Sequence, residues 1–227
     1  MLGNERAMSA QIAAIVAAGY AATVSTLVLA GLLLTHVLLD GPVGRWDTGS
    51  TRWLAEHRTG SLDGVMAFAS RSADTFGIIA VAVVVLIVLG TRRRWQQMAL
   101  LVTGLTLELS TFLAVNALVG RDRPDIPRMG STPSTSSFPS GHTAATLVLY
   151  GAIALFVSEE GRAFVWRALA WTAAALMPVV VGFARVYRGF HHPTDVAFGY
   201  ALGCAALLVA ALAVRTWSPK QNEETLR

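Results

Sequence analysis

Long apolar runs separated by short polar segments dominate this 227-residue chain. A helix crosses the hydrocarbon core of a bilayer with about 20 predominantly apolar residues. The runs show no alternation with a period of two, which favours helices over the strands of a membrane barrel. We therefore predict an all-α, polytopic membrane protein with six transmembrane helices. They cover residues 11–39, 74–90, 96–119, 143–158, 166–184 and 195–214, and the second has a helical lead-in from Leu62.

Composition supports a membrane protein. Hydrophobic residues make up 54% of the chain, charged residues 14%, and mean hydropathy is +0.53, whereas soluble domains are about a quarter charged. The first run is too long for a signal peptide and is predicted to be a membrane helix. We expect residues 1–227 to form one membrane domain, with 215–227 as a cytoplasmic tail. The basic residues are divided among loops, which predicts no nucleic-acid partner. The oligomeric state stays open.

The basic residues at the loop ends bear on orientation. A plain count on the two sides is a tie, but the densest short cluster is Arg92, Arg93 and Arg94. Basic clusters of this kind stay in the cytoplasm, so both termini are predicted to be cytoplasmic in the cell membrane. Two polar loops, 120–140 and 185–194, follow odd-numbered helices and then share the extracytoplasmic face. In either orientation they lie on the same side, because two crossings separate them.

The first polar loop has the chemistry of an anion site. It contains Arg121 and Arg123 and ends in Ser140, Gly141 and His142, where a helix is predicted to begin. Serine is a common N-cap, and glycine lets a ligand approach the backbone closely. The unpaired amides and the dipole at a helix N-terminus favour a bound phosphate oxygen. His142 would then lie beside that phosphate.

The second polar loop adds a nucleophile. His191 precedes Asp195 by four positions, a spacing that brings carboxylate and imidazole together and leaves the other ring nitrogen bare for attack. Arginine donates two hydrogen bonds to a phosphate and stays charged, so Arg123 and Arg185 are expected to hold the equatorial oxygens. His142 is the candidate acid that protonates the leaving alkoxide. The two loops together therefore predict phosphoryl chemistry.

At these residues the chain resembles the type 2 phosphatidic acid phosphatase (PAP2) family, membrane lipid phosphate phosphatases that share a helical-bundle core with the vanadium haloperoxidases. The family motifs are K-x6-R-P, P-S-G-H and S-R-x5-H-x3-D. The second motif is complete, and the third is present except for Ala184 in place of serine. The first keeps Arg123 and Pro124, but Asn116 stands where the family has lysine. The six predicted helices extend the resemblance to nearly the whole chain.

The resemblance implies hydrolysis through a phosphohistidine without a metal or other cofactor. The catalytic residues it implies are His191 as nucleophile, Asp195 as its orienting group and His142 as acid. It further implies a phosphate site that includes Arg123, Arg185, Ser140 and Gly141. Asn116 removes one cation from that site but can still donate a hydrogen bond, and Arg121 is expected to supply the charge instead.

The leading hypothesis is an enzyme that hydrolyses a lipid phosphomonoester or pyrophosphate, such as polyprenyl pyrophosphate, phosphatidic acid or phosphatidylglycerophosphate. Its partners would be the lipid substrate and membrane lipids. A phosphotransferase or head-group transferase on the same fold is an alternative, and a lipid-phosphate binder or transporter without catalysis is another. A metal site built from the histidines and Asp195 is disfavoured, because the surrounding arginines would repel a cation.

Overall fold

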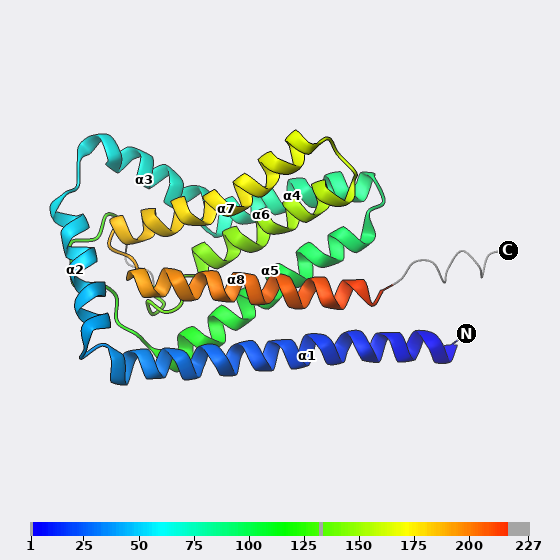
Figure 1. Ribbon diagram of the computed structural model, residues 1–227, viewed down its shortest axis with the longest axis horizontal. Coiled ribbons are helices and arrows are strands. Elements are labelled where there is room, and N and C mark those ends of the chain that lie inside the picture. Colours follow the sequence, from blue (N-terminus) through cyan, green and yellow to red (C-terminus); the bar gives the residue numbers. More distant parts are fainter. Residues whose placement is uncertain (1, 132–133, 218–227) are drawn as a thin grey trace.

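The chain folds into a long bundle of helices with a shorter helix across one end (Figure 1). The computed structural model describes residues 2–131 and 134–217. The elements are α1 (Leu2–Leu33), the π-helix η1 (Leu34–Leu38), α2 (Pro42–Glu56), α3 (Gly60–Ser72), α4 (Thr75–Thr91), α5 (Trp95–Val119), α6 (Gly141–Glu159), α7 (Phe164–Tyr187) and α8 (Pro193–Arg215).

The bundle has the lengths and surfaces of a membrane protein. Within the described residues, α1 together with η1, α5, α6, α7 and α8 are each long and apolar enough to cross a bilayer. The pair α3 and α4, bent by 55°, passes the same test together, which gives five or six spans. Large apolar side chains on the outer faces are exposed, among them Phe76 at 84% and Leu208 at 60%. The all-α membrane fold predicted from the sequence is therefore confirmed.

Several predicted helix boundaries are wrong. α1 begins at Leu2 rather than at residue 11, and α7 continues to Tyr187 rather than ending at 184, so Arg185 lies in a helix and not in a loop. Between residue 184 and Gly189 there is no glycine or proline, and the φ of 79° at Gly189 ends the helical path. α8 begins two residues early because proline is tolerated in the first turn of a helix. Residues 218–227 of the predicted tail lie outside the described residues.

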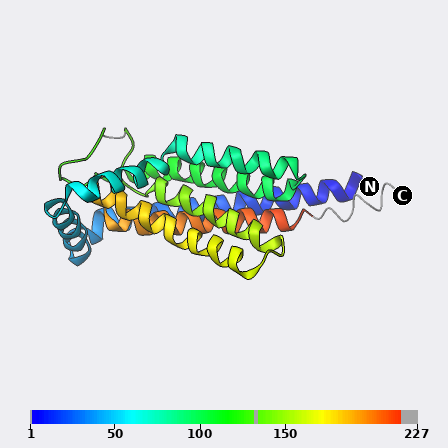
Figure 2. The same cartoon turned by 90° about the horizontal axis from the view of Figure 1, so that it is seen from above.

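The sequence analysis missed α2, which lies across one end of the bundle (Figures 1 and 2). Its outer face carries Trp46 and Trp53, each 57% exposed, and its inner face buries Asp47 and Thr51. Aromatic side chains of this kind favour the boundary between headgroups and acyl chains. The connections between α4 and α5 and between α6 and α7 lie at the opposite end of the bundle.

Small residues bring α6 and α8 into close contact at the end near α2. A Cβ added at Gly199 would lie 2.5 Å from the carbonyl oxygen of Ser140, and one at Gly203 would lie 2.9 Å from the carbonyl oxygen of Ala144. Interhelical contacts in membranes depend on such small residues, because they let backbones approach. The ring of Phe138 is fully buried beside them, 4.9 Å from the ring of Phe198. This packing places the starts of α6 and α8 side by side.

Candidate active site

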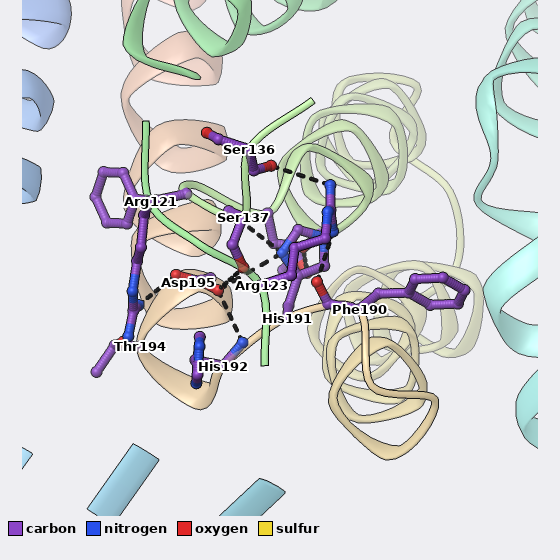
Figure 3. Close-up of polar contacts among 12 residues, drawn as sticks. Arg121, Arg123, Ser136, Ser137, Phe190, His191, His192, Thr194 and Asp195 are labelled. Atoms are coloured by element: carbon purple, nitrogen blue, oxygen red, sulfur yellow. Dashed lines mark hydrogen bonds and ion pairs between the residues drawn. The ribbon is translucent and has the colours of Figure 1, made fainter. Parts of the chain in front are cut away.

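The loop after α5 and the short link between α7 and α8 meet at the α2 end of the bundle. The backbone N–H of Ser140, at the start of α6, donates to the carbonyl oxygen of Asp195 at 2.9 Å. The Nη1 of Arg123 donates to the carbonyl oxygen of Phe190 at 2.5 Å. Figure 3 shows the side chains from both segments directed into one cluster. The two polar segments singled out in the sequence are therefore in direct contact.

His191 is held with one ring nitrogen bonded and the other available. Its side chain is 3% exposed, and Nδ1 lies 2.7 Å from the carbonyl oxygen of Ser137. A carbonyl only accepts, so Nδ1 carries the proton and Nε2 keeps its lone pair. Burial lowers the pKa of His191 well below its ordinary value, and the charges of Arg185 and Arg123 lower it further. The ring is therefore neutral and has a nucleophilic nitrogen.

Asp195 supports His191 less directly than the sequence suggested. The closest approach of its carboxylate to Nδ1 of His191 is 3.7 Å, so the carbonyl of Ser137 is the hydrogen-bond partner. The Oδ2 of Asp195 accepts from the hydroxyl of Ser137 at 2.5 Å and from the backbone N–H of His192 at 2.8 Å. The fully buried carboxylate thus fixes both segments and places a negative charge near the imidazole.

Arg121 is occupied by carboxylates. Its Nη2 donates to Oδ2 of Asp47 at 2.7 Å, and its Nη1 donates to Asp195 and, at 2.7 Å, to the hydroxyl of Thr194. The side chain is 2% exposed. The expectation that Arg121 supplies a charge to the phosphate is therefore at odds with its position. The sequence analysis missed Asp47, for which the only available signal was its place on one face of α2 together with Thr51.

Asn116 braces the first loop. Its Nδ2 donates to the carbonyl oxygens of Ser136 at 3.0 Å and Phe138 at 3.2 Å, and its Oδ1 accepts from the backbone N–H of Ser136 at 3.0 Å. A lysine at this position has no acceptor to offer that N–H. Asn116 therefore holds the loop, and its contacts argue against the expectation that it binds phosphate.

The start of α6 differs from the expected N-cap. The hydroxyl of Ser140 lies 3.0 Å from the hydroxyl of Thr143 and caps no backbone N–H. A Cβ at Gly141 would lie 3.1 Å from the ring of Phe112, so the glycine lets that ring pack against the helix end. Because no side chain caps α6, its N-terminal dipole faces the site without a competing hydroxyl. His142 lies in this first turn, close enough to His191 for their charges to interact.

Three arginines around the histidines lack an acidic partner: Arg123, Arg185 and Arg188. Among the described residues, no carboxylate oxygen lies within 4.0 Å of their nitrogens. Arg123 donates to backbone carbonyls of both segments. The guanidinium of Arg185 lies 4.2 Å from the centroid of the Phe190 ring, and its buried Nε has no hydrogen-bond partner. The cluster is therefore a cationic site suited to an anion.

Comparisons with known proteins agree with this geometry. A model of the PAP2 superfamily matches residues 98–219. An undecaprenyl-diphosphatase of Sulfolobus acidocaldarius is 27% identical over 178 residues, which cover 74% of this chain and 78% of that protein. A decaprenylphosphoryl-5-phosphoribose phosphatase of Mycobacterium tuberculosis is 32% identical over 149 residues, covering 61% of this chain and 75% of that protein.

A solved structure shares the fold. The transmembrane PAP2-type phosphatidylglycerolphosphate phosphatase of Bacillus subtilis superposes with a TM-score of 0.74 and 20% sequence identity, covering 87% of this chain and 97% of that one. At this identity the likeness concerns the arrangement of helices. It extends the match beyond residues 98–219 to most of the chain.

Proposed function

The chain belongs to the PAP2 superfamily and is a membrane lipid phosphate phosphatase, and we propose that it works through a phosphohistidine formed on His191. One observation carries the proposal. The Nδ1 of His191 is fixed on a carbonyl oxygen at 2.7 Å, which leaves Nε2 available beside Arg185 and Arg123, neither of which has an acidic partner among the described residues. A neutral, oriented imidazole next to a cationic pocket suits attack on phosphorus.

The proposed reaction has two displacements. Arg123, Arg185 and the N-terminus of α6 hold the phosphoryl oxygens. Nε2 of His191 forms a bond to phosphorus while the bond from phosphorus to the leaving oxygen breaks, and His142 gives that oxygen a proton. His142 then takes a proton from a water molecule whose oxygen attacks the phosphohistidine, which releases phosphate and restores His191. The nearby carboxylate of Asp195 stabilises the positive charge that the ring carries in between.

For the substrate, we propose a lipid phosphate or pyrophosphate with a long chain, such as a polyprenyl pyrophosphate. Relatives named for undecaprenyl diphosphate and for decaprenylphosphoryl-5-phosphoribose support a polyprenyl tail. The site lies at the α2 end of the bundle, where a tail can stay in the bilayer while the headgroup reaches the arginines. Arg92, Arg93 and Arg94 follow α4 at the opposite end, which supports an extracytoplasmic site.

Phosphate release from a panel of lipid phosphates in detergent, with EDTA present, tests the proposal. We expect release by the wild type and at least a 1,000-fold loss in His191→Ala, since removal of a nucleophile costs on the order of 10³ or more in rate. His57→Ala is the matched control, because His57 is an exposed histidine at the end of α2. Undiminished release by His191→Ala would remove the proposed nucleophile, and loss of wild-type release in EDTA would overturn the metal-free mechanism.

A further inference from the structure

Arg188 is a buried arginine at an unspecified position of the third motif, between Arg185 and His191. It is 8% exposed, its Nη2 donates to the carbonyl oxygen of Met129, and its guanidinium lies 5.3 Å from the centroid of the Phe190 ring. Its Nε is buried and has no hydrogen-bond partner among the described residues. A buried cation with an N–H that lacks an acceptor costs desolvation free energy unless a bound anion accepts from it. The position of Arg188 therefore indicates a ligand.

The surroundings of Arg188 point to the same anion that the histidines use. Arg185 and Arg188 both lie against the ring of Phe190, so two like charges are close to each other. Neither has a carboxylate within 4.0 Å in the part of the chain that the structure describes. Arg188 is also close enough to His142 for their charges to interact. Arg188 therefore lies beside Arg185 and close to the two histidines.

The charge balance of the two loops supports a second anionic group. In the first loop, Arg121 is neutralised by Asp47 and Asp195, whereas Arg123 has no acidic partner among the described residues. Arg185 and Arg188 add two more from the other segment. A diphosphate carries more negative charge than a monophosphate and offers these three arginines a second set of acceptor oxygens. The arginines therefore fit a diphosphate.

We propose that Arg188 binds the second phosphoryl group of a lipid diphosphate, the group that stays on the lipid when the terminal phosphate is removed. This inference rests on the proposed function and narrows its substrate class. Arg188 would donate through Nε and a terminal nitrogen to the leaving phosphate, and its charge would stabilise that phosphate as the bond to the terminal phosphorus breaks. Arg188 thereby selects diphosphates over monophosphates.

The test compares farnesyl diphosphate with farnesyl monophosphate in detergent. We expect Arg188→Gln to lower kcat/KM for the diphosphate by roughly 10- to 100-fold, as expected for loss of a charge-assisted hydrogen bond, and for the monophosphate by less than about threefold. Arg188→Lys should recover part of the diphosphate activity. Arg162→Gln is the matched control, because Arg162 is an exposed arginine that pairs with Glu160 at the far end of α6. An equal loss on both substrates would overturn the proposal, because Arg188 would then act only by holding the loop through its hydrogen bond to Met129.

A second measurement needs no variant. Inorganic pyrophosphate should inhibit wild-type hydrolysis of the monophosphate at least about 10-fold more tightly than inorganic phosphate does, because it can fill both subsites. Equal inhibition would overturn the second subsite. These outcomes are separate from failure of the proposed function, which shows as undiminished phosphate release by His191→Ala. An enzyme that needs His191 but hydrolyses only monophosphates would refute this inference alone.

Discussion

Replacing Asp47 by alanine should loosen the α2 end of the bundle. The carboxylate of Asp47 is buried and accepts from Nη2 of Arg121 at 2.7 Å, from the backbone N–H of Thr194 at 3.0 Å and from the hydroxyl of Thr194. It therefore connects α2 to the first turn of α8, next to Asp195. Alanine removes all of these acceptors and leaves Arg121 buried with a single carboxylate.

The size of the effect follows from these contacts. Removing one partner of a buried ion pair costs about 3–5 kcal/mol. Arg121 retains Asp195, so we take the lower end, about 3 kcal/mol. A chain of this size loses roughly 2–4 °C in Tm for each kcal/mol, which gives a decrease of about 6–12 °C. Asp47→Asn keeps an acceptor oxygen but not the charge, and its Tm should lie between those of Asp47→Ala and the wild type.

The assay is thermal unfolding in detergent followed by tryptophan fluorescence, with residual phosphatase activity measured after each heating step. Asp40→Ala is the control, because Asp40 is an exposed acid just before α2 and its loss should change the free energy of unfolding by less than about 0.5 kcal/mol. If Asp47→Ala unfolds within about 2 °C of the wild type, the buried pair does not hold α2 in place. The reasoning would then be refuted.

Two further predictions concern the site itself. Burial and the charges of Arg185 and Arg123 lower the pKa of His191, so the nucleophile stays unprotonated as the pH falls through about 6.5, and activity is lost only at lower pH. After correction for substrate ionisation, an acid limb of kcat/KM at or above pH 6.5 would contradict this. Asn116→Lys should lower the free energy of unfolding by about 1–3 kcal/mol, because the N–H of Ser136 loses its acceptor. Tighter orthovanadate inhibition with an unchanged Tm would show instead that the lysine reaches the anion.

The membrane helices could be predicted from the sequence because hydrophobic length is a local property. An apolar run of about 20 residues needs no partner elsewhere in the chain to be recognised. α2 has no such run, and it was missed because its composition alone resembles a polar loop. The face of α2 that packs on the bundle buries the polar residues Asp47 and Thr51, so hydrophobicity alone does not mark it as a buried face. That burial depends on Thr194, which lies 147 residues away.

The sequence was sufficient to predict which residues form the candidate site, but not which groups they contact. Side-chain chemistry and spacing brought out His142, His191 and Asp195, since each needs a particular residue type. The partner of His191 is the backbone carbonyl of Ser137, and a backbone group leaves no signature in the sequence. The same applies to Asn116, whose contacts are with backbone groups of the loop. For this reason the sequence patterns predicted Asp195 as the partner of His191 and the phosphate as the partner of Asn116.

Arg121 and Arg123 show how the fold separates structural arginines from those available to a ligand. They lie two positions apart, yet Figure 3 places Arg121 with Thr194 and Asp195 on one side of the cluster and Arg123 with His191 and Phe190 on the other. Two carboxylates neutralise Arg121, whereas Arg123 donates to carbonyl oxygens and to the hydroxyl of Thr135, which leave its positive charge uncompensated. The position of the acids therefore decides which arginines can attract a phosphate. Because Asp47 pairs with Arg121, the positive charge available to the anion comes from Arg123 and from Arg185 and Arg188 at the end of α7.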